Sequence, residues 1–143
     1  MRLTKSDQRL RRRARARALQ ALYAWDIAGT GPLLTATERL WDDMAVGPEE
    51  RDFAAPLMRW LDANRESIDA QLADVTTNWR LERLGAVERS ILRLGVAEFA
   101  RPDVPVRVTI QESVRLAERF GSAESAKFVN GVLDALARRL GRL

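Results

Sequence analysis

Histidine and cysteine are both absent from this chain of 143 residues. The lack of histidine removes the commonest general base and metal ligand of proteins, together with the nucleophile pairs that depend on it. The lack of cysteine excludes disulfide bonds and thiolate metal sites, and is typical of a reducing cytoplasm. No glycine-rich segment has the pattern of a phosphate-binding loop between a strand and a helix. The sequence therefore argues against an enzyme, a metal site and a bound cofactor.

Long apolar segments are also missing. No run approaches the ~20 residues that a membrane-spanning helix needs. The N-terminal arginines adjoin no uncharged apolar segment, so a signal peptide is not expected. Hydrophobic residues make up 46% of the chain and charged residues 31%, which is typical of a globular protein of about one domain. We therefore expect a cytoplasmic protein with no membrane contact.

Positive charge is concentrated at the N-terminal end. Residues 1–17 carry a net +7 and the whole chain +4, so that residues 18–143 carry a net −3. A basic end on a mildly acidic body suggests two different partners, one anionic and one basic. Most of the positive charge comes from six arginines: Arg9, Arg11, Arg12, Arg13, Arg15 and Arg17.

The same segment predicts an amphipathic helix. At about 100° per residue, its apolar side carries Ala14, Ala18, Ala21, Leu22 and Trp25. Its opposite side carries Arg9, Arg13, Arg17 and Gln20, and its flanks carry Arg11, Arg12 and Arg15. The planar guanidinium group matches phosphate oxygens and base edges. A basic run is often only a solvated arm. Because this run shares a helix with a core-facing stripe, we interpret it as an RNA- or DNA-binding surface.

Two helices are predicted in the first third of the chain. The first begins after Thr4 or Ser6 and ends near Ala28, because the following sequence GTGP supplies glycine for the helix exit and a proline that cannot continue it. The sequence TATE over 35–38 has the spacing of a capping box, which predicts the start of the second helix.

Five more helices complete an all-α domain of about seven helices. Pro48 opens the third helix, in which Pro56 predicts a kink or a restart. The others are predicted over 67–75 and 86–100, around 110–117, and in the last segment, where Val129, Val132, Leu133, Leu136 and Leu140 form an apolar stripe. A loop is predicted over 101–105, and no stretch alternates with a period of two for long enough to predict a strand.

Phe128 lies about 100° from the centre of the apolar stripe of the last helix. A phenylalanine outside such a stripe is either covered by another helix or available for stacking on a base or a partner. A phenylalanine at such a position is a core residue in most helical proteins, and helical periodicity alone does not favour the stacking interpretation over it.

Four segments resemble the NusB family of bacterial transcription antitermination factors. They are 11–27 (RRRARARALQALYAWDI), 84–99 (LGAVERSILRLGVAEF), 103–120 (DVPVRVTIQESVRLAERF) and 125–134 (SAKFVNGVLD). The resemblance implies an all-α fold of two three-helix halves around a long first helix. It implies one RNA-binding domain over 1–143, whose basic arm 1–13 leads into that helix.

The resemblance also implies a function and partners. These are binding of single-stranded boxA RNA in nascent ribosomal RNA leader transcripts, a complex with the ribosomal protein NusE, and assistance to the elongating RNA polymerase against termination. The implied RNA-binding residues, to which Arg9 is added by its place in the arginine run, are Arg9, Arg11, Arg12, Arg13, Arg15, Gln20, Tyr23, Lys127 and Phe128. Glu82 and Glu88 match acidic positions on the NusE side.

The chain departs from the family pattern at a few positions. Many members have asparagine in place of Gln111, tyrosine in place of Ala97, and an aromatic or longer side chain in place of Val106. Asp7 occupies a place that can be basic. These departures leave most of the RNA-binding surface unchanged. They leave the details of the surface that binds the protein partner open.

Two other classes of function stay open at this point. One is an RNA-recognition domain of the type fused to RNA methyltransferases, although the absence of a cofactor-binding half within these 143 residues counts against autonomous activity. The other is a helix-turn-helix DNA-binding regulator, which would prefer duplex DNA to single-stranded RNA. The oligomeric state, including a homodimer, is likewise open.

Overall fold

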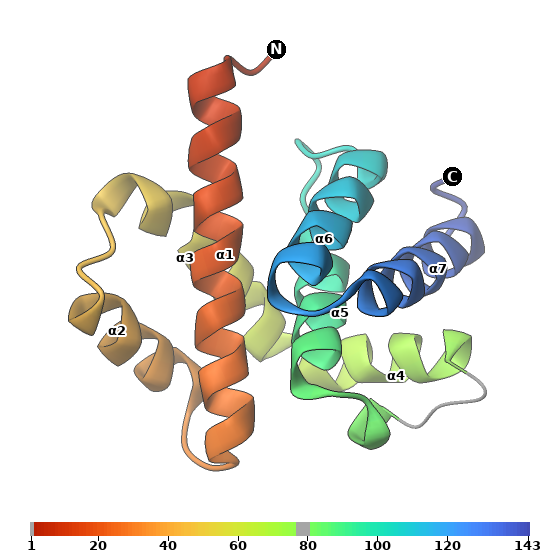
Figure 1. The fold of residues 1–143 in the computed structure, drawn as a ribbon, viewed down its shortest axis with the longest axis horizontal. Helices are drawn as coiled ribbons and strands as arrows, with labels where there is room; N and C mark the ends of the chain where they lie inside the picture. The colour runs from red at the N-terminus through yellow and green to blue at the C-terminus, as the bar shows by residue number, and fades with distance from the viewer. Residues whose placement is uncertain (1, 77–80) are drawn as a thin grey trace.

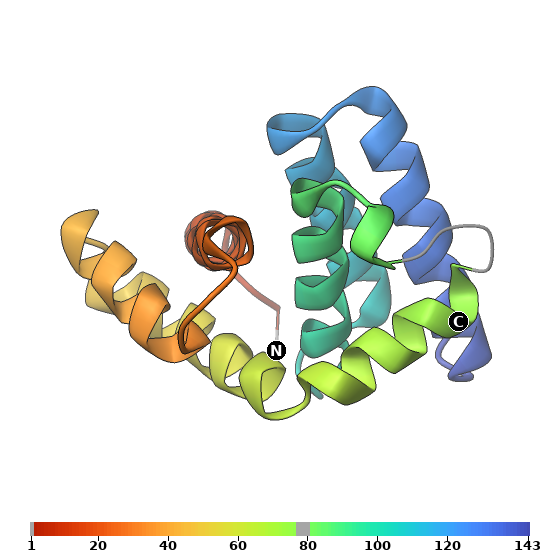
Figure 2. The same cartoon turned by 90° about the horizontal axis from the view of Figure 1, so that it is seen from below.

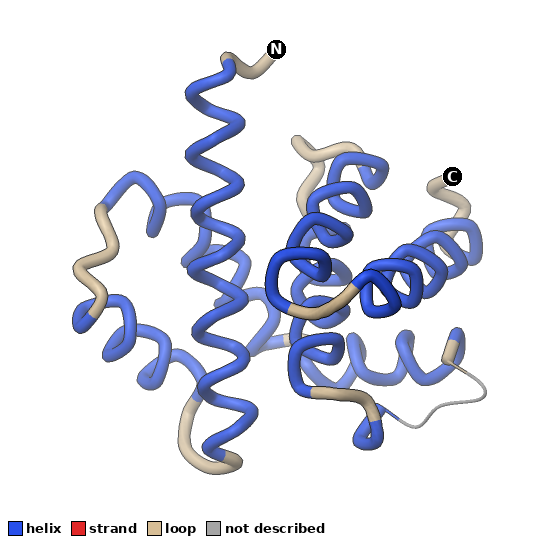
Figure 3. The backbone as a smooth tube through the Cα atoms, in the orientation of Figure 1, coloured by secondary structure: helices blue, strands red, loops and turns tan. Residues whose placement is uncertain are grey.

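The computed structural model describes residues 2–76 and 81–143, apart from the side chain of Glu82. All regular structure in this part of the chain is helical (Figures 1 and 3). The helices are α1 (Lys5–Ala28), α2 (Leu33–Asp43), α3 (Pro48–Ala63), α4 (Arg65–Val75), the 3-10 helix η1 (Leu81–Arg83), α5 (Ala86–Phe99), α6 (Val106–Phe120) and α7 (Ala123–Arg139). None of these described helices combines the length and the apolar character needed to cross a membrane.

The ends of α1 follow from local chemistry. Thr4 caps the N-terminus: its side chain accepts a hydrogen bond from the Asp7 backbone N–H at 3.0 Å, and the Asp7 carboxylate accepts from the Thr4 N–H and hydroxyl. These hydrogen bonds from Thr4, with the nearby Arg11, hold the pKa of Asp7 below its ordinary value of 3.8. Gly29 ends the helix with a φ of 73°, which lies in the left-handed region that favours glycine. Both predicted ends of α1 are confirmed.

The helices form two halves that share α1 as a central element (Figures 1 and 2). In one half α1 packs on α2 and α3; in the other α5, α6 and α7 pack together, and α4 lies across α5 and α7. Both α1 and α3 also pack on α5, which joins the halves. The predicted stripe of α1 is in the core along most of its length: Ala14, Ala18, Ala21 and Leu22 are almost completely buried, and Trp25 is partly buried against the core. The predicted all-α architecture is confirmed.

Three local predictions were wrong. The second helix begins at Leu33, with Pro32 as N-cap and no side-chain cap, and not at a capping box over 35–38. Leu33 is only 1% exposed, so burial of this side chain favours the earlier start. The third helix continues through the exposed Pro56, so the restart is wrong, while the alternative of a kink at this residue stays a prediction. Leu140 is 45% exposed, because α7 ends one residue before it.

The other predicted elements are confirmed with small shifts of their ends. The fourth helix begins at Arg65, two residues before the predicted start. The loop over 101–105 is present, and Gly121 ends α6 as expected. Of the bend predicted over 78–85, residues 78–80 lie outside the described part of the chain, η1 occupies 81–83, and Leu84 and Gly85 connect it to α5.

Candidate nucleic-acid interface

The arginines of α1 differ greatly in exposure. Arg9, Arg12 and Arg13 are exposed, and Arg11 and Arg17 are half-buried. Arg15 is only 4% exposed. The run of basic residues therefore divides into an exposed set that can meet a ligand and one arginine that lies inside the protein.

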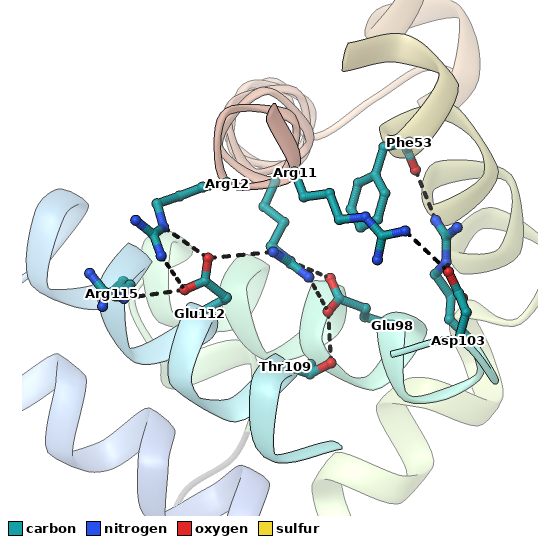
Figure 4. A network of polar contacts seen from close by, with 10 residues as sticks. Arg11, Arg12, Phe53, Glu98, Asp103, Thr109, Glu112 and Arg115 are labelled. Atoms are coloured by element: carbon teal, nitrogen blue, oxygen red, sulfur yellow. Dashed lines mark hydrogen bonds and ion pairs between the residues drawn. The ribbon is translucent and has the colours of Figure 1, made fainter. Parts of the chain in front are cut away.

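Arg15 forms an ion pair with a buried carboxylate of α5. Its Nε donates to Glu98 Oε1 at 2.7 Å and its Nη2 donates to Glu98 Oε2 at 3.0 Å. The Thr109 hydroxyl of α6 donates to Glu98 Oε2 at 2.7 Å (Figure 4). Glu98 is 1% exposed, so both charges are removed from water and depend on one another. This pair connects α1 to α5, that is, one half of the fold to the other.

Glu112 of α6 binds three arginines at the side of this pair. Arg12 donates to both of its oxygens, from Nε at 3.0 Å and from Nη2 at 3.4 Å. Arg15 Nη1 donates to Glu112 Oε1 at 3.4 Å, and Arg115 Nε lies 3.2 Å from Oε2 (Figure 4). Three guanidinium groups thus share the carboxylates of Glu98 and Glu112, which leaves an excess of one positive charge.

The ring of Phe53, on α3, is surrounded by three guanidinium groups. Those of Arg11, Arg15 and Arg101 lie 4.9, 5.1 and 4.5 Å from the centre of its ring, within the range of cation–π attraction. Arg101 also donates to the Phe53 carbonyl at 3.1 Å. Burial raises the pKa of Asp103. The positive charges of Arg101 and Arg11 and the hydrogen bonds to this carboxylate lower the pKa by more, so that it lies below its ordinary value of 3.8. Arg11 is therefore partly held by Phe53 and Asp103.

Glu50 of α3 restrains two further arginines of α1, Arg13 and Arg17. Arg17 Nε donates to Glu50 Oε1 at 3.2 Å, and Arg13 Nε lies 3.7 Å from Oε2. Arg17 Nη1 also donates to Gln20 Oε1 at 3.2 Å. The side chain of Arg13 is 53% exposed, so this long contact leaves it available to an external anion.

Two hollows lie beside α1, one between α1 and α6 and one between α1, α2 and the facing ends of α5 and α6. The first is a groove of about 420 Å³, lined by Arg12, Arg15, Glu112, Arg115, Leu116, Glu118 and Arg119. The second, of about 400 Å³, is mostly apolar and is lined by Leu19, Gln20, Tyr23, Ala24, Leu40, Met44, Val87 and Phe120. Gln20 and Tyr23, predicted from the sequence, thus lie in a hollow beside the arginine groove, and Tyr23 is 41% exposed.

Lys127 and Phe128 lie in the second turn of α7, after the Ser122 cap. Lys127 is exposed. Phe128 is half-buried and packs partly against the hydrophobic core, so its position lies between the two interpretations of the sequence. Its role in RNA binding stays a prediction.

The two acidic residues expected on the partner side have different outcomes. Glu88, in the first turn of α5, is half-buried, and its Oε1 accepts a hydrogen bond from the Ser125 hydroxyl of α7 at 2.7 Å. Glu82 belongs to η1, but its side chain lies outside the described part of the structure.

Comparison with known proteins decides the family. The model of the NusB family matches residues 12–138. The chain belongs to the NusB family.

The NusB relatives and solved structures described below match this chain over nearly its whole length. The chain is 46% identical over 131 residues to the transcription antitermination protein NusB of Anaeromyxobacter dehalogenans (strain 2CP-1), which covers 91% of this chain and 92% of that protein. It is 42% identical over 131 residues to the NusB protein of Sorangium cellulosum, covering 90% and 92% of the two chains. Among solved structures, T. maritima NusB has a TM-score of 0.81 at 32% identity, covering 90% of each chain. A crystal structure of antitermination factors NusB and NusE in complex with dsRNA has a TM-score of 0.80 at 30% identity, covering 92% of this chain and 98% of that one.

The departures from the NusB pattern can now be located. Ala97 is completely buried and Val106 is 7% exposed, so both changes lie in the core. Gln111 is exposed on α6. Of these three positions in the NusB fold, Gln111 is therefore the one that can meet a partner directly.

Several residues of this interface were not identified from the sequence: Phe53, Glu98, Glu112, Arg115 and Arg119. A signal existed for Glu98, which follows the apolar residues Val96 and Ala97 and precedes Phe99. A carboxylate at such a position needs a buried cation as its partner. The pattern could not show that this cation is Arg15, which lies 83 residues away.

Proposed function

We propose that this chain is a transcription antitermination factor that binds boxA RNA of ribosomal RNA leader transcripts together with NusE. The observation that carries the proposal is the face of α1 opposite the core, where Arg9, Arg12 and Arg13 are exposed. Its support is membership of the NusB family and likeness to a NusB structure that contains NusE and RNA. In this proposal the whole chain acts as one RNA-binding domain in the cytoplasm, without catalysis and without a cofactor.

The exposed arginines bind phosphates, and the neighbouring aromatic residues contact bases. Arg12 and Arg13 present planar donors that suit phosphate oxygens. Tyr23 and Phe128 offer ring surface on which an unpaired base can stack, and single-stranded RNA exposes such bases. Lys127 and Gln20 complete the polar contacts.

Arg15 has an indirect role in this proposal. Its Nε and Nη2 donate to Glu98 and its Nη1 donates to Glu112. Almost none of its surface meets solvent. It therefore holds α1 against α5 and α6, which fixes the positions of the exposed arginines. Arg11 combines the two roles, because it is held by Asp103 and Phe53 but keeps part of its surface.

The acidic end of α5 is the proposed contact for NusE. Glu88 lies there with a half-buried carboxylate, and residues 18–143 carry the net negative charge that suits a basic ribosomal protein. Bound RNA and NusE would then present a joint surface to the elongating RNA polymerase.

The test replaces Arg12 and Arg13 by alanine and titrates boxA RNA at several salt concentrations. The slope of log K against log salt is negative, and each lost phosphate contact on a single strand should reduce its magnitude by about 0.7. We expect RNA affinity to fall about tenfold or more and the magnitude of the slope to decrease by about 1. The matched control removes Arg138 and Arg139 at the end of α7, which changes the net charge equally at a distant site.

Three results would contradict the proposal. They are unchanged affinity and salt slope in the Arg12/Arg13 variant, an equal loss in the control, and duplex DNA competing better than boxA RNA. The last result would favour a DNA-binding regulator. The melting temperature of each variant shows that the fold is retained.

A further inference from the structure

We propose that the groove between α1 and α6 is an additional phosphate-binding part of the RNA interface, in which Arg115 and Arg119 of α6 act with Arg12 of α1. The inference rests on the proposed function, since the ligand is the same RNA. It assigns a role to two arginines that lie outside the motifs used to predict the site.

The walls of the groove come from both helices. Arg12 and Arg15 line it from α1, and Glu112, Arg115 and Arg119 line it from α6. The side chains of Arg12 and Arg115 are 45% and 60% exposed, whereas that of Glu112 is 9% exposed. The carboxylate of Glu112 therefore forms the floor, and the two guanidinium groups rise from it toward solvent.

Glu112 positions these two groups without using all their donors. It lies 3.0 Å from Arg12 Nε and 3.2 Å from Arg115 Nε through different oxygens. Among the described residues, the terminal nitrogens of Arg115 have no hydrogen-bond partner. A guanidinium group that is fixed at Nε and free at its outer nitrogens can bind a phosphate with little further loss of side-chain freedom.

The charge of the groove favours an anion. Arg12, Arg15, Arg115 and Arg119 face three carboxylates, those of Glu98, Glu112 and Glu118. Within the described residues Arg119 has no ion pair, and its guanidinium group lies 4.8 Å from the ring centre of Phe120. The groove thus holds an uncompensated positive charge that a phosphate would neutralise.

The groove also connects the separate parts of the predicted RNA site. One wall belongs to the arginine face of α1. At its other end Arg119 is followed by Phe120, which lines the hollow that contains Gln20 and Tyr23. Gly121 then ends α6 and leads into α7, where Lys127 and Phe128 lie. An RNA strand in the groove would pass from the arginines of α1 to both sets of base-contacting residues.

The test removes Arg115 and Arg119 together and titrates boxA RNA over a range of salt. We expect affinity at least about tenfold weaker than wild type and a salt slope lower by about 1, because up to two phosphate contacts are lost. The control variant, Arg138→Ala with Arg139→Ala, has the same net charge and should stay within about twofold of wild type. A second variant, Arg115→Lys with Arg119→Lys, keeps the charge and should recover the salt slope but only part of the affinity, because lysine lacks the planar fork of donors.

The outcomes separate this inference from the proposed function. If the Arg115/Arg119 alanine variant binds as well as the control while the Arg12/Arg13 variant is weakened, the groove is not a phosphate site and the proposed function stands. If the lysine variant does not recover the salt slope, or if alanine at 115 and 119 lowers affinity without making the slope shallower, charge is not the cause and the inference fails. If the wild-type chain does not bind boxA RNA, the proposed function itself is wrong.

Discussion

Replacing Arg15 by methionine should destabilise the fold far more than replacing any exposed arginine of α1. The substitution removes two hydrogen bonds, at 2.7 and 3.0 Å, from the carboxylate of Glu98, which is 1% exposed. The Thr109 hydroxyl would remain as the close donor to this buried charge. Loss of one partner of a buried ion pair costs about 3–5 kcal/mol.

The expected change in melting temperature follows from the size of the chain. An unfolding entropy of about 2.1 cal/mol/K per residue gives about 0.3 kcal/mol/K for a chain of this length. A loss of about 3–5 kcal/mol therefore lowers the melting temperature by about 10–17 °C. Thermal unfolding followed by circular dichroism measures this shift directly.

A double-mutant cycle tests the physical reason. Glu98→Gln removes the buried negative charge and keeps an acceptor for Thr109, so the Arg15→Met, Glu98→Gln double variant should be more stable than the sum of the single changes by about 2 kcal/mol. Arg17→Met is the matched control on the same helix, because Arg17 pairs with Glu50 near the surface and should lose less than about 1 kcal/mol. Additive effects in the cycle, or an Arg15 variant that melts within 3 °C of the Arg17 control by this roughly 0.3 kcal/mol/K scale, would refute the reasoning.

Three further predictions concern other parts of the surface. Phe128→Ala should weaken boxA binding about tenfold and destabilise less than Leu136→Ala, whose cavity costs about 2–5 kcal/mol; equal melting of the two would show that Phe128 is a core residue. Glu88→Lys should reduce NusE recovery in a pull-down while RNA binding by the isolated chain persists, and full recovery would contradict the partner assignment. Because the pKa of Asp7 is lowered, its stabilisation of the first turn is present above pH 3.8 and is lost as pH falls through the lower folded value. The protection of amides near Asp7, measured relative to their intrinsic exchange rate at each pH, should therefore fall at low pH in wild type but not in Asp7→Asn.

The elements were predictable where a residue acts through its own neighbours. Local hydrogen bonding or backbone preference sets three predicted helix ends, and the structure confirms them. They are the start of α1 after Thr4, its end at Gly29 and the start of α3 at Pro48. The prediction failed at Leu33, where contact with the rest of the core outweighs a capping pattern a few residues later. Local signals are weak compared with the burial of a large side chain.

The candidate site was predictable in its residue types but not in its assignment of roles. Helical phase placed Arg12 and Arg15 on the flanks of α1, and could not show that one is exposed and the other buried. That difference depends on Glu98 and Glu112, which come from helices far away in the sequence. Arg115 was missed for the same reason, since its importance follows from the helix it faces.

The division of the fold also bears on the order in which it is built. One half uses residues 5–63 and the other residues 65–139, so most packing joins segments that are close in the chain. Such local contacts form quickly, and the first half can assemble while the rest of the chain is still being synthesised. The pair between Arg15 and Glu98 spans 83 residues and can close only after α5 has left the ribosome. Arg15 therefore stays a solvated charge during early synthesis, and the arginine groove is completed only when α6 arrives.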